Sequence, residues 1–129
     1  MSVLELNGRV FDASTTGTLT LTGEGSATTD VTQGLLKVWV DLDGTGTVSI
    51  DNSFNVASVA DNGTGDYTFT FSNNFANANF AGGGICGNRA LSIFNSRATS
   101  NTNTYTQDHN DGTNEVDKLT TLLLCGDLA

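Results

Sequence analysis

Apolar and polar residues alternate in short runs between residues 38 and 71. Because successive side chains of a β-strand point to opposite faces, the alternation gives each run one apolar face and one face of Thr, Ser and Asp. Asp-Gly and Asn-Gly pairs separate the runs, and these pairs tolerate the positive φ angles of tight hairpin turns. The pattern predicts antiparallel strands with one buried face. The apolar positions are Val38, Val40, Leu42, Val48, Ile50, Tyr67, Phe69 and Phe71.

The stretch that leads into these runs, residues 31–40, is compatible with a helix, but its β-branched residues and the turn after it favour a strand from Leu35 to Val40. After Phe71 the chain is irregular up to Phe80, and we expect Phe75 and Phe80 to reach the core.

Strand-like patterns resume in the second half of the chain. Residues 81–87 (AGGGICG) predict a glycine-rich strand, and residues 89–94 alternate again. Residues 99–107 are almost wholly polar, and residues 108–114 (DHNDGTN) predict a hairpin tip. Residues 116–125 hold the most apolar run, which predicts either a strand covered on both faces or a subunit contact.

The sequence therefore predicts an all-β fold, an antiparallel β-sandwich of jelly-roll or Ig-like type over residues 31–129. Residues 1–30 differ, because their strands are brief and a polar, glycine-containing link follows them. We interpret them as an N-terminal β arm that completes itself on a partner, with edge strands of the same sandwich as the open alternative. The candidate anchor residues are Val3, Leu4, Leu6, Val10, Phe11, Leu19 and Leu21.

Charge narrows the possible partners. The 129 residues include 14 acidic and 5 basic side chains, for a net charge of −9, and no Lys/Arg cluster. This balance disfavours binding to nucleic acid and to anionic membranes. No stretch has the length and apolarity of a signal peptide or a membrane helix, so we expect synthesis in the cytoplasm as a soluble chain without a signal peptide.

Cys86 and Cys125 are the two cysteines. They could form one disulfide, but a chain without a secretion signal gives this pairing little support. Cys86 lies among glycines and Cys125 ends an apolar run, so two buried free thiols are the interpretation that we favour.

One segment imitates a calcium-binding loop. Residues 41–52 match a helix-loop-helix calcium site at its first, third, sixth and eighth positions. Asn52 stands where the site needs a bidentate Glu, and strand-like residues precede the loop. We therefore predict a β-turn at Asp43–Gly46 and no metal or other cofactor.

No constellation of residues indicates catalysis. His109 is the single histidine, in a polar loop beside Asp108 and Asp111, where a solvated side chain is the usual outcome. A Cys86–His109 dyad would need a third orienting group and a pocket, for which the sequence offers no signal. We predict that the protein is not an enzyme.

Several segments carry a resemblance to a known family: residues 30–39 (DVTQGLLKVW), 44–48 (GTGTV), 51–56 (DNSFNV) and 61–68 (DNGTGDYT). They resemble a domain of small virion proteins of tailed bacteriophages, especially marine and cyanobacterial ones, in tail-fibre-like and other appendage proteins. The family's usual Asp-Ser-Phe-Asn is here Asn52–Asn55. Because these motifs consist of turn and strand residues, the resemblance implies a fold and no catalytic site.

The resemblance implies a homotrimer on the virion surface, acting as a capsid decoration or short head fibre. Its partners would be the major capsid protein lattice or tail proteins. In this interpretation Val3–Leu21 anchor the protein by strand addition. The alternative is a tail-fibre tip or adhesin whose loops at residues 99–114 bind a host glycan or protein. The candidates for the core and the trimer contact are Trp39, Phe54, Leu119, Leu122 and Leu124.

Overall fold

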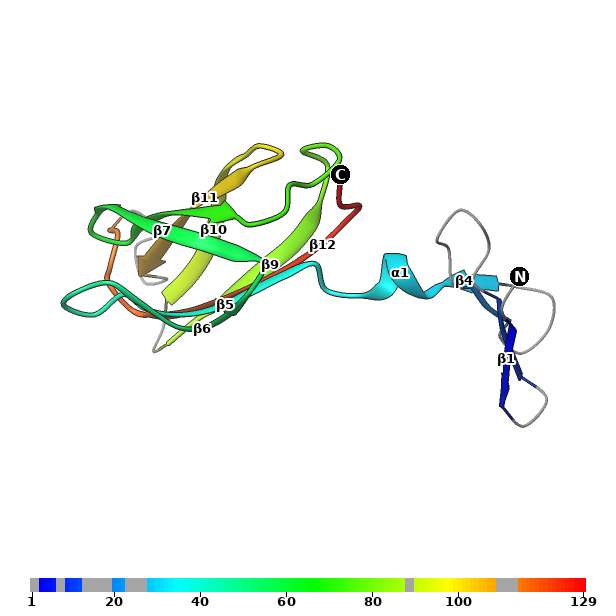
Figure 1. Cartoon of the computed structure of the whole chain (residues 1–129). Coiled ribbons are helices and arrows are strands. Elements are labelled where there is room, and N and C mark those ends of the chain that lie inside the picture. The colour runs from blue at the N-terminus through cyan, green and yellow to red at the C-terminus, as the bar shows by residue number, and fades with distance from the viewer. Residues whose placement is uncertain (1–2, 7–8, 13–19, 23–27, 88–89, 109–113) are drawn as a thin grey trace. The chain divides into compact units, whose positions relative to one another are not determined.

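The computed structural model of the chain describes residues 3–6, 9–12, 20–22, 28–87, 90–108 and 114–129 (Figure 1). Its contacts divide the chain into two units, Met1–Leu35 and Leu36–Ala129, and each is described by itself. The sequence placed the corresponding boundary after Asp30.

The N-terminal unit consists of two small hairpins and a helical turn. Strand β1 (Val3–Leu6) pairs antiparallel with β2 (Arg9–Asp12), and β3 (Thr20–Thr22) pairs antiparallel with β4 (Thr28–Asp30). The helical turn α1 (Val31–Gly34) follows directly. Strands this short bury little surface, so these hairpins need further contacts for stability.

The predicted anchor residues fall on these strands with one exception. Val3, Leu4 and Leu6 lie in β1, Val10 and Phe11 lie in β2, and Leu21 lies in β3, whereas Leu19 is outside the described residues. Their role in anchoring stays a prediction. The strand expected from Leu35 is wrong in its first residues, because α1 precedes them and β5 begins at Val38.

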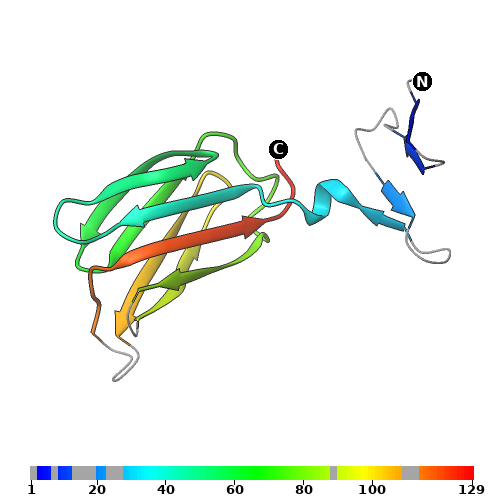
Figure 2. The ribbon, with the colours of Figure 1, turned by 90° about the horizontal axis from the view of Figure 1, so that it is seen from below.

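The second unit is an antiparallel β-sandwich, which confirms the predicted fold class (Figures 1 and 2). Eight strands form one hydrogen-bonded sheet that folds into two layers. Layer 1 has the order β6-β5-β12-β9, and layer 2 has the order β10-β11-β8-β7. The strands are β5 (Val38–Asp43), β6 (Ser49–Phe54), β7 (Val56–Gly63), β8 (Asp66–Phe71), β9 (Ala81–Cys86), β10 (Ala90–Arg97), β11 (Asn101–Asp108) and β12 (Leu119–Cys125).

The core lies between the layers and is built by alternate residues of β5, β8 and β12, as the alternation predicted. The phenyl rings of Phe75 and Phe80, from the irregular segment before β9, close one end of it. Phe75 stacks on Phe80 with ring centroids 4.4 Å apart, and Phe71 meets both rings edge-on. The buried apolar side chains are Val38, Val40, Leu42, Tyr67, Phe69, Phe71, Phe75, Phe80, Leu122 and Leu124.

Strand β12 lies between β5 and β9 and pairs with both. Thr120, Leu122 and Leu124 are buried, whereas the intervening residues are exposed or half-buried. The prediction of a strand covered on both faces is therefore wrong in this chain, because layer 2 covers only one face of β12.

The polar stretch around residue 105 is a strand rather than a loop. Strand β11 lies between β10 and β8, and the side chains of Thr102, Thr104 and Thr106 are buried. The Thr102 hydroxyl donates to the Ser96 carbonyl at 2.8 Å, and the hydroxyls of Thr106 and Thr120 are 3.4 Å apart. Threonine is β-branched and favours strands, so Thr at every second position indicates a strand here. The polar composition of the stretch led to the expectation of a loop.

A single residue carries the chain from layer 1 to layer 2. Asn55 lies between β6 and β7 with a φ of +60°, a left-handed conformation that asparagine tolerates better than most residues. Its side-chain amide donates to the Lys37 carbonyl and to the Asn73 carbonyl, both at 3.1 Å. Asn55 thus holds three segments together at one end of the sandwich.

The opposite end is held by Asp117. Its carboxylate accepts hydrogen bonds from the Gly65 amide at 2.7 Å and from the Tyr67 hydroxyl at 2.9 Å. Burial raises the pKa of Tyr67, and the hydrogen bond to the Asp117 carboxylate raises it further. A side chain at Gly44 would overlap the Tyr67 hydroxyl, so the tight turn after β5 needs glycine there.

Two neighbouring glycines of β9 differ in their surroundings. A Cβ atom at Gly82 would overlap the Leu123 carbonyl oxygen and Cδ2 of Leu124, whereas a Cβ atom at Gly83 would meet no atom within 4 Å. We expect Gly82→Ala to lower the free energy of unfolding by about 1–3 kcal/mol through overpacking. Gly83→Ala should leave it unchanged or raise it by up to ~1 kcal/mol. Urea unfolding of both variants measures the difference, and equal losses would contradict this account.

The buried hydroxyls of β11 give a second matched pair. Thr104 Oγ1 has no hydrogen-bond partner among the described residues, whereas Thr102 Oγ1 has the Ser96 carbonyl. We expect Thr104→Val to raise the free energy of unfolding by about 1 kcal/mol, because it removes an unpaired buried polar group. Thr102→Val should lower it by a similar amount. Thermal unfolding of both variants tests the pair, and a loss of stability in Thr104→Val would refute the explanation.

Candidate interaction surfaces

The outer face of layer 1 carries the largest exposed apolar side chains of the sandwich. Because Val38, Val40 and Leu42 point inward, Trp39 points outward, and the strand register places Phe54 and Leu123 on either side of it. Phe54 is 52% exposed, and Trp39 and Leu123 are half-buried. Single exposed apolar residues are ordinary, but a contiguous group indicates an interaction surface.

The five residues predicted for the core and the trimer contact therefore separate into two groups. Leu122 and Leu124 are core residues, at 1% and 0% exposure. Phe54 and Leu119, each more than half exposed, lie outside the core, and so does Trp39. Alternation alone could not distinguish them, because both faces of β5 and β12 carry apolar residues.

The outer face of layer 2 is polar and internally hydrogen-bonded. The Asn103 amide donates to Asp66 Oδ1, to the Tyr67 carbonyl and to Thr68 Oγ1. Asn95 donates to Asn103 Oδ1 at 2.7 Å and to the Tyr105 hydroxyl at 3.0 Å. Since these donors and acceptors satisfy one another, the face is a structural network. The expected loop at residues 99–114 is a strand over Asn101–Asp108, and its binding role stays a prediction.

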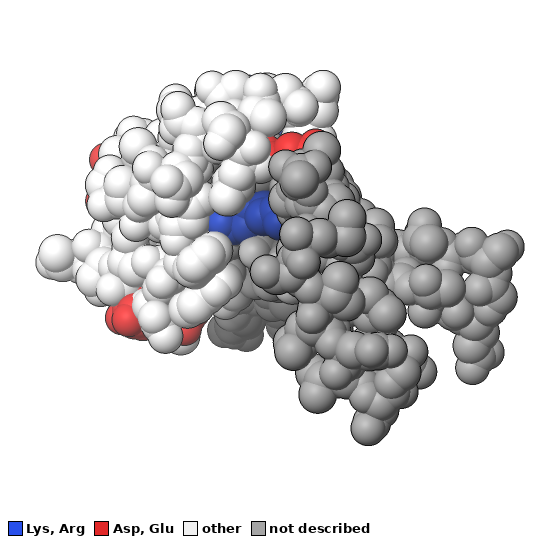
Figure 3. Space-filling model, turned by 45° about the vertical axis from the view of Figure 1, so that its right-hand side comes forward, with Lys and Arg blue, Asp and Glu red and all other residues white. Residues whose placement is uncertain are grey.

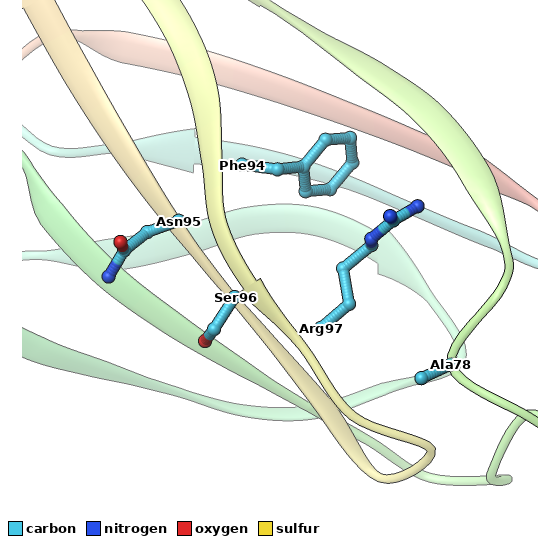
Figure 4. Close-up of a pocket in the computed structure, with 5 residues that line it drawn as sticks. All are labelled: Ala78, Phe94, Asn95, Ser96 and Arg97. Atoms are coloured by element: carbon cyan, nitrogen blue, oxygen red, sulfur yellow. The ribbon is translucent and has the colours of Figure 1, made fainter.

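A pocket of about 570 Å³ opens where β9 and β10 diverge, since these strands pair only through Leu91–Ile85 and Ser92–Gly84. Figure 4 shows Phe94 and Arg97 on one side of β10, toward Ala78, with Asn95 and Ser96 on the other side. Arg97 Nη1 donates to the Phe80 carbonyl at 2.8 Å, and Arg97 Cζ lies 5.9 Å from the centroid of the Phe80 ring.

Arg97 brings a positive charge into an acidic molecule. On the face that Figure 3 shows, a group of basic atoms is bordered on one side by uncharged residues, and acidic residues lie above it and to the lower left. A guanidinium has five N–H donors, and the contact with Phe80 uses one. The arrangement is chemically suited to a carboxylate group, which arginine binds through paired hydrogen bonds.

The segment that imitates a calcium loop is a hairpin connection between β5 and β6, with a strand on each side. Asp43 Oδ1 accepts hydrogen bonds from the Thr45 amide at 2.8 Å and the Thr45 hydroxyl at 2.6 Å. These bonds lower the pKa of Asp43, the hydroxyl contributing most. Gly46 has a φ of +73°, as the predicted turn requires.

The two cysteines are free, so the disulfide that the sequence left open is wrong in this structure. Cys86 points inward, with Sγ 3.6 Å from Thr120 Oγ1, and Cys125 lies on the outer face, opposite Ala81. Both thiols are half-buried. Because the two side chains lie on opposite faces of layer 1, their sulfur atoms do not meet to form a disulfide.

His109 lies outside the described residues. Among the residues that the structure describes, no three His, Cys, Asp or Glu side chains are grouped to hold a metal ion. In the same part of the chain, no helix has the length and apolarity needed to cross a membrane.

No family model, curated protein or solved structure matches the chain.

The turn after β5 gives a prediction about acidity. We expect Thr45→Val to raise the pKa of Asp43, because the stronger of its two hydrogen bonds is lost, while Thr47→Val in the same loop leaves it unchanged. Since the folded-state pKa is lowered, ionised Asp43 stabilises the fold above its ordinary pKa of about 3.9, and this contribution is lost as the pH falls through the folded value. Carboxyl-carbon chemical shifts measured against pH give the pKa of Asp43 in each variant. An unchanged Asp43 pKa in Thr45→Val would show that the Thr45 hydroxyl does not lower it.

Proposed function

We propose that the protein is a structural component of a tailed-bacteriophage virion, a small capsid-surface decoration or short fibre. Its N-terminal unit anchors it, and its sandwich points outward. The observation that carries the proposal is the two-part chain: a unit of short hairpins precedes a sandwich with its own core. The resemblance of residues 28–125 to phage appendage proteins supports the same role.

The physical argument for anchoring is the shortness of the strands in the N-terminal unit. Strands of three or four residues carry few apolar side chains, and the edge of a two-stranded hairpin is a place where another strand can pair. A capsid or tail protein could complete them by strand addition, in which main-chain hydrogen bonds supply affinity. The role is therefore one of binding and assembly rather than catalysis.

The Arg97 pocket favours one alternative, an adhesin at the tail that binds an acidic host glycan. Gold labelling of particles with an antibody against the sandwich separates the two roles. Label on the head supports decoration, and label at the tail tip supports the adhesin.

We expect deletion of residues 1–22 to yield a folded sandwich that is absent from purified particles, as judged by immunoblot. Leu4→Ser with Phe11→Ser should reduce incorporation in the same direction. The control, Ala57→Ser with Ala60→Ser, changes exposed side chains on β7 of the sandwich and should be incorporated normally. Incorporation of the truncated chain at the normal level would refute anchoring by the N-terminal unit.

A further inference from the structure

Four residues form a row across the outer face of layer 1, one from each strand. The register pairs Trp39 with Phe54, Leu123 with Trp39, and Leu123 with Gly83. The row therefore runs Phe54, Trp39, Leu123, Gly83, from a large exposed ring to a position without a side chain. We call these residues the apolar row.

Gly83 has no role inside the molecule that accounts for its missing side chain. Unlike its neighbour Gly82, it has open space where a Cβ atom would lie, and its φ is not among the positive values of the described glycines. A glycine inside a strand is unfavourable, and it often marks a place where another surface approaches closely. Gly83 thus indicates a partner on the outer face.

We propose that the apolar row is a contact between two copies of this chain, related by a two-fold axis that runs parallel to the strands between β5 and β12. Such an axis reverses the order of the strands and keeps each residue at its height along them. Phe54 of one copy then lies over Gly83 of the other, and Trp39 lies over Leu123. The bulky end of each row fills the empty end of its partner, which is the self-complementarity that an isologous contact requires.

The neighbouring row of side chains keeps the carboxylates of the two copies apart. It runs Asn52, Asp41, Thr121, Ile85 across the same four strands. The same axis places Asp41 over Thr121 of the other copy, and Thr121 Oγ1 already donates to Asp41 Oδ1 at 3.3 Å within one copy. In these two rows, two chains of net charge −9 therefore meet without one carboxylate lying over another.

The size of the face predicts a weak contact. Four strands about 4.8 Å apart and the two rows about 6.8 Å apart span roughly 260 Å². Stable complexes bury about 800 Å² per partner, so the dimer should dissociate on dilution. An anchored array would hold copies close together and favour the contact. Because an isologous contact closes after two copies, the homotrimer that the resemblance implies would use a different surface.

Disulfide trapping tests the contact in the full chain. The variant carries Phe54→Cys and Gly83→Cys in a background of Cys86→Ala and Cys125→Ala. Within one copy these positions are three strand spacings apart, about 14 Å, which exceeds the Cα separation of a disulfide, about 4.4–6.8 Å. A bond must therefore join two copies. On mild oxidation we expect nearly complete conversion to a dimer on a non-reducing denaturing gel.

The controls separate the proposed contact from random collision. A mixture of the Phe54→Cys and Gly83→Cys single variants should also form the dimer, whereas each single variant alone should not. Ala57→Cys, exposed on β7 of layer 2, should not bond to Gly83→Cys. Equal trapping of the Ala57 pair, absence of the dimer, or a ladder of larger species would each overturn the two-fold contact.

A second measurement does not depend on cysteine chemistry. We expect Gly83→Phe to shift the sedimentation profile of the full chain to the monomer at concentrations where the parent chain forms dimer, with an unchanged circular-dichroism spectrum. Dimer formation at the parent level by this variant would also overturn the proposal, because the ring would occupy the space of the partner's Phe54.

Discussion

The sandwich depends on the insertion of β12 between β5 and β9. This strand supplies backbone partners to both neighbours, and its inward residues Leu122 and Leu124 are buried to 1% and 0% exposure. Burial of two leucine side chains is worth about 3–6 kcal/mol, a large part of the roughly 5–15 kcal/mol that stabilises a typical domain. Without β12, layer 1 would consist of the β5–β6 hairpin and the separate strand β9, and layer 2 would have little to cover it.

Polar side chains hold the ends of the sandwich where the apolar core stops. Asn55 joins three segments at one end, and Asp117 ties the turn at Gly65 to the hydroxyl of Tyr67 at the other. Each of these side chains satisfies backbone donors or carbonyls that a turn leaves unpaired. The outer face of layer 2 is satisfied in the same way, so the apolar outer face of layer 1 differs from it in character, and the two faces have different capacities for association.

Local patterns were sufficient to predict the strands at 38–43, 66–71 and 81–86, because alternation and glycine-containing turns are encoded within a few residues. They failed for β11, whose threonines are buried by the opposite layer, a tertiary effect that composition does not reveal. They also failed for Leu35–Lys37, which were expected to belong to a strand although β5 begins only at Val38. The order of the strands depends on pairing between distant segments, which no local pattern specifies.

Trp39 and Phe54 of the candidate surface were predicted from the sequence, whereas Leu123 and Gly83 were not, and core and surface roles were not separated. Trp39 and Val40 are both apolar neighbours on one strand, and only the position of layer 2 decides which is buried. Gly83 could not be distinguished from Gly82, because the difference is that a Cβ atom at Gly82 alone would overlap atoms of Leu123 and Leu124. The pocket at Arg97 arises from the divergence of β9 and β10, a feature of twist and pairing that the sequence leaves open.

The placement of β12 also affects the chain during its synthesis. A ribosome makes β5 and β9 well before the strand that separates them, and the N-terminal hairpins emerge before either. In that interval the edges of β5 and β9 are free to pair with the same strands of other nascent chains. Where many copies are translated together, insertion of β12 into a neighbouring chain would compete with its insertion between β5 and β9 of its own chain. Crowding during translation would therefore favour misfolding of this protein more than of one built from sequential hairpins.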